Sequence, residues 1–353
     1  MIPASVSSRG QVSDPLLRFS VKVKLMPLTH ARRLKRRVTR RLSVDGAQRV
    51  VTIEYRYGLG NQMFQLLTAL NYARKTESKL ILHDDPERFS KMSNKPGYHA
   101  RPRYFDSVFK ALKPCCVDNY EAYRWDTEHR DSFGTFRDLA HLRRYKHLKL
   151  SGYFLSYKYF EDDFEDLLKE LEIRTSIAAT RDRFRQLFDP ERLQISLHVR
   201  LGDFKNTSDV HFILGPTYYS NAVLRILRAL EWDGTNGVDI LIFCEEEDDE
   251  LVNQSYLPHI ADSVARASEL DGSKLEGKLR FLKVPNDATD WEQMYLMSSC
   301  HHHVIANSTF SWWGAYLNAN PEKQVVYPAQ WLTEHMTAQI FPDLIPPAWM
   351  AET

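Results

Sequence analysis

Residue types suited to binding a phosphate occur together in the segment His198-Val199-Arg200-Leu201-Gly202-Asp203. Arg200 offers a planar guanidinium, and Asp203 can orient it through a two-point ion pair. Gly202 gives the backbone a flexible turn beside these side chains. We therefore expect an anion-binding site here. The spacing alone fits a second interpretation equally well, a structural Arg-Asp pair followed by a turn glycine.

A second polar segment, Asn307-Ser308-Thr309, precedes a helix-like run at 310–317. Its amide, its hydroxyls and the free backbone N–H groups of a helix start together favour an anion site. Simple helix capping is the alternative interpretation. Farther along the same run, the paired indoles of Trp312 and Trp313 are expected to lie one in the core and one near the ligand.

Several common site chemistries are excluded by pattern. The turn Gly58-Leu59-Gly60-Asn61-Gln62 lacks the third glycine of a dinucleotide fingerprint, and no P-loop sequence occurs. The adjacent residues His301-His302-His303 point to different faces, so we interpret them as structural. No Asp-x-Asp occurs to hold a divalent cation at a diphosphate. We predict no metal site, and the positive charge must come from Arg200 and backbone dipoles.

Alternating strand and helix patterns must position these segments. Short runs of β-forming residues occur at 195–199, 238–243, 279–282, 304–306 and 325–327, with helix-like segments between them. This alternation predicts a parallel, doubly wound sheet, in which ligands bind beyond the carboxyl ends of the strands. We therefore expect segments 200–204, 244–249 and 307–311 to share one rim.

The first half of the chain has a similar but weaker pattern. A strand at 50–55, the glycine turn, a helix with apolar residues between 63 and 73, and a strand at 79–83 follow one another. Residues 84–148 have little periodicity and suit a loop-rich, substrate-facing region. A further strand is expected at 148–154 and a helix at 160–171. Thr289 and Glu292 have the spacing of a capping box that opens a helix.

Composition separates a basic N-terminal arm from an acidic body. The chain has 353 residues, room for about two domains, and its composition is that of an ordinary globular protein. Residues 1–47 carry eleven Lys or Arg and two Asp, a balance of +9, so a net charge of +1 leaves −8 for the rest. The arm lacks the apolar run of a secretory signal, and no segment suits a membrane-spanning helix. A solvated extension and a contact with anionic membrane both fit. Nucleic-acid binding is not expected, because the body is acidic.

Several strings resemble the α-1,2-fucosyltransferase family. They are Gly58-Leu-Gly-Asn-Gln-Met-Phe-Gln65, Gly152-Tyr-Phe154 with Tyr159-Phe-Glu-Asp162, the His198–Asp203 segment, and the stretch from Trp291 through Ala306-Asn-Ser-Thr-Phe-Ser-Trp-Trp-Gly-Ala315. The resemblance covers residues 50–332 in the family's order. It implies an α/β fold of two Rossmann-like lobes, of the glycosyltransferase B type, here with a basic unstructured arm. We expect the arm at 1–47, an acceptor-side lobe at 48–190 and a donor-binding lobe at 191–345.

The resemblance also implies roles for single residues. Arg200 would bind the diphosphate and stabilise the leaving GDP, with His198, Gly202 and Asp203 shaping that strand end. Asn307, Ser308 and Ser311 would contact the nucleotide, and Asn61 would face the cleft from the other lobe. Asp203 and Asp209 are the candidate general bases. The chain departs from the family pattern at Tyr57, where Gly is usual, at Leu201, where Arg is usual, and at Cys244-Glu245-Glu246, where Ser-Asp-Asp is usual.

By this resemblance the chain transfers L-fucose from GDP-β-L-fucose to the 2-hydroxyl of a galactose-terminated glycan, with inversion and without a metal or other cofactor. The alternatives are a fucosyltransferase of different linkage and a non-catalytic protein that binds a nucleotide sugar or a glycan. A third, an anionic-surface adaptor, would act through the arm. The few scattered cysteines favour a reducing compartment. We expect a cytoplasmic or peripheral membrane location, with the Golgi as the alternative.

Overall fold

The computed structural model describes residues 48–83, 102–131, 134–206, 212–268, 277–333 and 342–353, without the side chains of Asp203 and Asn206. The basic arm, the segment 84–101 and Asp209 lie outside the described residues. In the part of the chain that the structure describes, no helix has the length and apolarity needed to cross a bilayer.

The first sheet has four strands in the order β2-β1-β4-β3, and all its pairs are parallel. Its strands are β1 (Val50–Glu54), β2 (Lys79–Leu80), β3 (Thr127–Arg130) and β4 (His147–Ser151). Val50, Val51 and Ile53 of β1 are buried, as expected for a β-branched strand covered on both faces. The carboxyl ends of β1 and β4 lie level, because Glu54 pairs with Ser151.

Helix α2 (Leu59–Thr76) returns the chain from β1 to β2 and packs on this sheet. Its apolar residues, which include Met63, Phe64, Leu66 and Leu67, are fully buried. The helices after β4 are α4 (Phe164–Glu170) and α5 (Ile173–Arg183). Short 3-10 turns occupy Lys110–Cys115, Tyr120–Ala122, Ala140–Arg144, Tyr157–Tyr159, Glu161–Asp163 and Arg185–Leu187.

The second sheet has six parallel strands in the order β10-β9-β8-β5-β6-β7. They are β5 (Arg192–His198), β6 (Gly237–Phe243), β7 (Leu279–Lys283), β8 (His302–Val304), β9 (Val325–Pro328) and β10 (Met350–Glu352). Strands β5 and β6 are almost wholly buried, so the sheet forms the centre of an apolar core.

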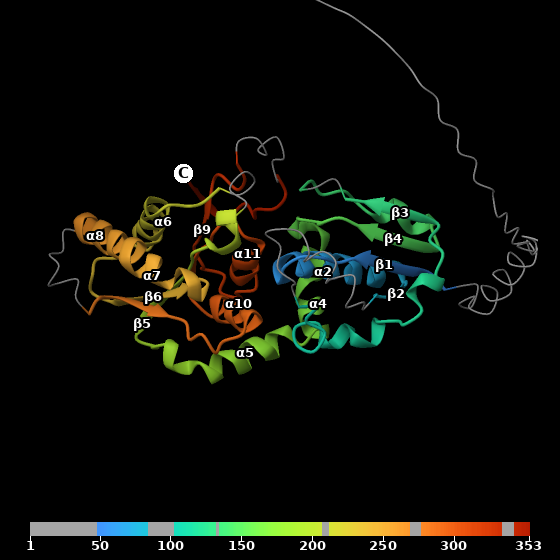
Figure 1. Ribbon diagram of the computed structural model, residues 1–353, viewed down its shortest axis with the longest axis horizontal. Helices are drawn as coiled ribbons and strands as arrows, with labels where there is room; N and C mark the ends of the chain where they lie inside the picture. Colours follow the sequence, from blue (N-terminus) through green and yellow to red (C-terminus); the bar gives the residue numbers. More distant parts are fainter. Residues whose placement is uncertain (1–47, 84–101, 132–133, 207–211, 269–276, 334–341) are drawn as a thin grey trace, which may run out of the picture. The chain divides into compact units, whose positions relative to one another are not determined.

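Helices connect these strands on both sides, as parallel pairing requires. They are α6 (Pro216–Ala229), α7 (Asp249–Leu251), α8 (Leu257–Ser268), α10 (Asp290–Ser298) and α11 (Thr309–Tyr316), with 3-10 turns at Gly202–Asn206 and Glu246–Asp248 and a π turn at Val252–Tyr256. Helices α6 and α8 lie side by side over the second sheet, and α5 lies beside α10 (Figure 1). The capping box predicted at Thr289 and Glu292 is confirmed, since both of its hydrogen bonds open α10.

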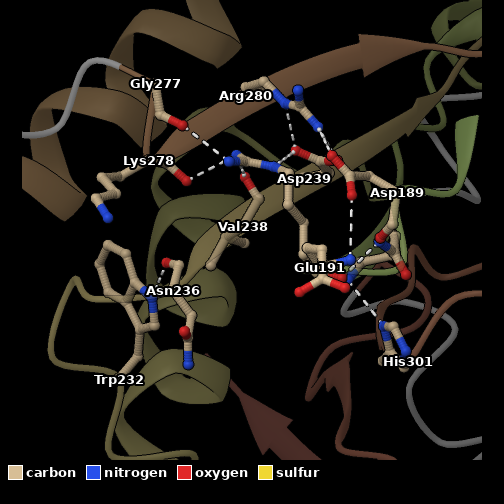
Figure 2. A network of polar contacts seen from close by, with 12 residues as sticks. Asp189, Glu191, Trp232, Asn236, Val238, Asp239, Gly277, Lys278, Arg280 and His301 are labelled. Carbon is tan, nitrogen blue, oxygen red and sulfur yellow. Dashed lines mark hydrogen bonds and ion pairs between the residues drawn. The ribbon is translucent and has the colours of Figure 1, made fainter.

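A charged network holds the amino edge of the second sheet. The Asp239 carboxylate in β6 is completely buried and accepts hydrogen bonds from Arg192 Nε at 2.5 Å and from Arg280 Nε at 2.7 Å. Arg192, the first residue of β5, also donates to the carbonyls of Gly277, Val238 and Lys278 (Figure 2). This network therefore joins β5, β6 and β7 at the ends where they begin.

The predicted fold class, α/β with two Rossmann-like lobes that each contain a parallel sheet, is confirmed. The five strands expected in the second half are present, although β5 begins three residues and β8 two residues earlier than predicted. Strands β3 and β10 were not predicted. β10 follows residue 345, where we expected the second lobe to end, and it pairs with β9. The division at 48–190 and 191–345 stays a prediction.

Candidate functional site at the carboxyl edge of the second sheet

The segments that follow β5 and β6 contact each other, as the shared rim predicts. Arg200 Nη1 donates to Glu245 Oε1 at 2.5 Å, and the Arg200 guanidinium lies 5.3 Å from the centre of the Phe204 ring. The Arg200 side chain is only 17% exposed, while that of Glu245 is 41% exposed. Arg200 is thus held in one place at the strand end by a carboxylate from the neighbouring strand.

Asp248 holds the turn that follows Arg200 through two contacts. Its buried carboxylate accepts the backbone N–H of Gly202 at 2.8 Å and pairs with Lys205. Gly202 has φ +21, and a Cβ there would lie 2.6 to 2.8 Å from the Glu245 carboxylate. Only glycine fits this close approach without moving Glu245. Gly202 therefore has two roles. Its lack of a side chain leaves room for the Glu245 carboxylate, and its N–H bonds to Asp248.

The predicted Arg200–Asp203 pair stays a prediction, because the Asp203 side chain lies outside the described residues. Sequence reasoning did not find Glu245 as the partner of Arg200. The signal was present in the acidic run Glu245–Glu250, which the pattern favours as a solvated helix start. In the structure Glu245, Glu246 and Glu247 line an open hollow of about 470 Å³ beside Arg200.

His198 ends β5 and is nearly buried, with its ring 5.6 Å from that of Phe310. Burial, reinforced by the Arg200 charge, lowers the pKa of His198 to about 3. Its imidazole is therefore neutral at ordinary pH. Within the described ranges, no group hydrogen-bonds to its Nδ1. A neutral ring with an unused nitrogen at this edge suits a ligand hydroxyl or N–H better than a phosphate charge.

The start of α11 forms the third part of the rim. The Ser308 side chain caps the helix by accepting Phe310 N–H at 3.3 Å, and the buried Ser311 hydroxyl donates to the Ser308 carbonyl at 3.3 Å. Asn307 Nδ2 donates to the carbonyls of Phe212 and Trp331. Its buried Oδ1 has no hydrogen-bond partner among the described residues. In this arrangement Asn307 can offer a ligand an acceptor, and Ser308 acts as a cap.

Asn61 reaches this rim from the first turn of α2. Its Oδ1 accepts a hydrogen bond from Thr309 Oγ1 at 3.1 Å, so the starts of α2 and α11 touch. A Cβ on Gly60 would lie 2.5 to 2.7 Å from the backbone of Thr309 and Phe310. The absence of a side chain at Gly60 therefore admits the backbone of α11.

The expectation that one of the paired indoles lies near the ligand is wrong. Trp312 and Trp313 are both fully buried, and their Nε1 groups donate to the carbonyls of Leu344 and Gly60, each at 2.9 Å. Both N–H groups find partners inside the protein, so both rings can be buried in the core that α11 shares with α2.

The three adjacent histidines use their ring nitrogens within the protein. Nδ1 of His301 and of His302 accept the backbone N–H groups of Gln194 and Gln324, and His303 Nδ1 lies 2.8 Å from Ser196 Oγ. Within the residues that the structure covers, no group of three or more His, Cys, Asp or Glu side chains is placed to hold a metal ion.

Comparison with known proteins identifies the class. Residues 21–351 match Glycosyl transferase family 11, and the chain belongs to that family. The resemblance to α-1,2-fucosyltransferases is thereby confirmed.

Three curated relatives show how the family's members vary. The O-antigen biosynthesis glycosyltransferase WbnK of Escherichia coli is 24% identical over 81% of this chain and 96% of its own length. An α-1,2-colitosyltransferase of Escherichia coli is 25% identical over 78% and 89%. The galactoside 2-α-L-fucosyltransferase of Caenorhabditis elegans is 23% identical over 85% and 78%. The chain is similar to glycosyltransferases that differ in the sugar they transfer.

Proposed function

We propose that this family 11 glycosyltransferase transfers L-fucose from GDP-β-L-fucose to the 2-hydroxyl of a galactose-like residue on a glycan, with inversion and without a metal. The observation that carries the proposal is Arg200, a largely buried guanidinium at the carboxyl end of β5, beside His198 and an open hollow. Two of the relatives are named as enzymes that attach a sugar at a 2-position, and they support the proposed attack by the 2-hydroxyl of the acceptor.

In the proposed reaction the acceptor hydroxyl attacks C1 of fucose as the bond from C1 to the β-phosphate oxygen breaks. Negative charge then builds on the departing GDP, and the Arg200 guanidinium neutralises it. The acceptor proton passes to a carboxylate, for which the sequence offers Asp203 and Asp209. His198 and the free acceptor atom of Asn307 bind uncharged polar groups of the donor.

The test is GDP release from GDP-fucose with N-acetyllactosamine as acceptor and EDTA present, with the product linkage determined by NMR. Arg200→Ala should lower kcat/KM by about 30- to 1000-fold, equivalent to roughly 2 to 4 kcal/mol of transition-state stabilisation. Near-normal turnover by this variant would remove Arg200 from the mechanism. Loss of activity in EDTA, restored by Mg²⁺ or Mn²⁺, would overturn metal independence.

A second donor is favoured by the colitosyltransferase relative. Colitose is fucose without its 3-hydroxyl, so GDP-colitose is the competing substrate in the same assay. A higher kcat/KM for GDP-colitose would reassign the donor. GDP binding without transfer to any sugar would favour the non-catalytic binding protein.

The location belongs to the same proposal. We propose that the protein acts in the cytoplasm or at an anionic membrane surface that the basic arm contacts. Cosedimentation with vesicles that contain phosphatidylserine, compared for the full chain and for a chain without residues 1–47, tests this contact.

A further inference from the structure

Two tyrosines stack at the carboxyl edge of the first sheet. The rings of Tyr57 and Tyr153 are nearly parallel, with 5.1 Å between their centres and 7° between their planes. Tyr57 comes three residues after β1 ends and Tyr153 two residues after β4 ends, at strand ends that are level. Both side chains are partly exposed. The pair therefore lies where parallel α/β sheets bind ligands.

Two buried glutamines of α2 hold the turns that carry these rings. Gln65 accepts Arg56 N–H and donates to the Gly152 carbonyl, both at 2.8 Å, and so joins the residues that precede the two tyrosines. Gln62 donates to the Tyr57 carbonyl at 2.7 Å and to the Pro102 carbonyl at 2.8 Å. Gln62 and Gln65 are at most 1% exposed. The position of the stack is thus fixed by groups that solvent does not reach.

The backbone of Tyr57 has a conformation that a tyrosine adopts only at a cost. Tyr57 has φ +69, a conformation that glycine adopts freely and that residues with a Cβ rarely adopt. A glycine would satisfy the turn at lower conformational cost. The tyrosine therefore carries a conformational cost at this position, and what it adds over a glycine is its aromatic ring.

The stacked tyrosines are also close in sequence to the start of α2, which contacts the proposed donor-binding lobe. Tyr57 immediately precedes Gly58, the N-cap of α2, and Asn61 in the first turn of α2 touches Thr309 of α11. The charges around Tyr57 are paired, because Glu54 pairs with both Arg56 and Lys149 and Lys149 also lies 3.2 Å from the Glu128 carboxylate. A neutral ligand with an apolar face fits this surface better than an anion does.

We propose that Tyr57 and Tyr153 form the acceptor subsite, an aromatic surface against which the C–H face of a pyranose ring packs. The inference rests on the proposed function, since it names the surface that holds the sugar whose hydroxyl reacts. Gln62 and Gln65 act as positioning residues, because they hold the two turns and do not need to touch the sugar.

The test compares four variants with the wild type. One of them, Tyr153→Phe, removes only the hydroxyl and keeps the aromatic face. Tyr57→Gly removes one ring and relieves the backbone, and Tyr153→Leu keeps apolar bulk without the aromatic face. Tyr123→Leu is the matched control. The Tyr123 ring stacks on Trp125, with 6.0 Å between the ring centres and 16° between the planes, and both residues precede β3, at the amino ends of the strands of the same sheet. Measured quantities are the KM for N-acetyllactosamine, kcat, the Kd for GDP and the melting temperature.

Tyr57→Gly and Tyr153→Leu should each raise the acceptor KM by about tenfold, with the Kd for GDP changed by less than about twofold. Tyr153→Phe and Tyr123→Leu should leave the acceptor KM within about twofold of the wild type. An unchanged acceptor KM in Tyr57→Gly and Tyr153→Leu would overturn the proposal. A parallel loss of GDP affinity would also overturn it, since the stack would then act on the whole site.

Saturation-transfer NMR on the wild type covers the cases in which a variant fails to fold or no transfer is detected. The protein is deuterated except at its tyrosine rings, and N-acetyllactosamine is the probe. Saturation of the galactose ring protons that disappears in whichever of Tyr57→Gly and Tyr153→Leu still shows a cooperative melting transition supports the subsite, even if fucosyl transfer from GDP-fucose fails. Absence of saturation from the tyrosines in the wild type would contradict it.

Discussion

At the scale of single residues, the contact that bears most directly on the proposed donor binding is the ion pair between Arg200 and Glu245. The guanidinium that we propose for the diphosphate already has a carboxylate on Nη1. Two further glutamates follow Glu245 along the same hollow. An anionic ligand must therefore enter a surface whose cation is partly neutralised and whose border is acidic.

Glu245→Gln should strengthen GDP binding. The substitution keeps the shape of the side chain but removes the charge that competes for Arg200, so the Kd for GDP should fall by about three- to tenfold at low salt. The gain should shrink at about 0.3 M NaCl, because salt screens exposed charges. Isothermal titration calorimetry at both salt concentrations measures it. Weaker binding by this variant would instead show that Glu245 bonds the nucleotide directly.

The place of Arg200 was predictable from sequence, and the identity of its partner was not. A strand followed by Arg, Gly and Asp fixes which sheet edge carries the guanidinium, since parallel strands end on the same side. The partner comes from a segment 45 residues away, and which of several adjacent carboxylates points inward depends on the turn after β6. The burial of both indoles was missed for a related reason, because the carbonyl of Gly60 that accepts from Trp313 lies 253 residues away in sequence.

At the scale of elements, the contact between α2 and α11 depends on a single missing side chain. Gly60 and Gly58 belong to the same turn, but a Cβ on Gly60 would collide with the α11 backbone, whereas a Cβ on Gly58 would meet nothing within 4 Å. Of the two glycines in this string, Gly60 is therefore required for packing.

Gly60→Ala should lower the free energy of unfolding by about 1 to 3 kcal/mol, even though alanine is the better helix former, because backbone atoms must move to accept the methyl group. Gly58→Ala, at the N-cap, should stay within about 1 kcal/mol of the wild type. Urea unfolding monitored by tryptophan fluorescence compares the two. Equal losses would mean that helix packing does not explain this glycine.

Strand β8 carries a buried histidine that links stability to pH. Burial, reinforced by the nearby His301, lowers the pKa of His302 to about 4. The unfolded chain then binds more protons than the folded one between the ordinary histidine pKa of about 6.5 and pH 4, so stability falls as the pH drops through this window. Above pH 6.5 the contribution of His302 is complete.

His302→Asn should reduce this pH dependence. Asparagine keeps an acceptor for the Gln324 N–H that His302 Nδ1 now accepts, but it cannot be protonated. The loss of unfolding free energy between about pH 7 and pH 5 should be smaller in the variant by roughly 2 kcal/mol. Urea titrations at both pH values provide the comparison. Parallel curves for wild type and variant would show that His302 does not titrate on unfolding.

The elements with strong periodicity were predictable, and the exceptions have physical causes. The strands of the second sheet are continuous runs of β-formers because both of their faces are buried. Strand β3 has the sequence Thr-Glu-His-Arg and lies at the edge of its sheet, where one neighbour is enough. Strand β10 has only three residues and is the outermost strand of the second sheet. Its sequence, Met-Ala-Glu, is too short to predict that it pairs with β9.

At the scale of the whole molecule, the proposed site and a stabilising charged network lie at opposite ends of the strands of the second sheet. The carboxyl edge carries Arg200, Glu245 and the start of α11, whereas the amino edge carries the network around Asp239. The two edges are about 20 Å apart, since β5 and β6 each have seven residues. Substitutions at one edge should therefore leave the other intact.

Asp239→Asn tests this separation. Removal of a fully buried carboxylate leaves Arg192 and Arg280 facing each other without their shared anion, and breaking such a network costs about 3 to 5 kcal/mol of unfolding free energy. The Kd for GDP, measured well below the melting temperature, should nevertheless stay within about twofold of the wild type, because additivity holds for distant sites. Asp106→Asn is the matched control, since Asp106 also pairs with a cation, Lys113, but its side chain is 90% exposed, and its melting temperature should not change. If Asp239→Asn weakened GDP binding as much as it lowered stability, the amino edge would have to position Arg200 through β5, and the two ends of the sheet would form one cooperative unit.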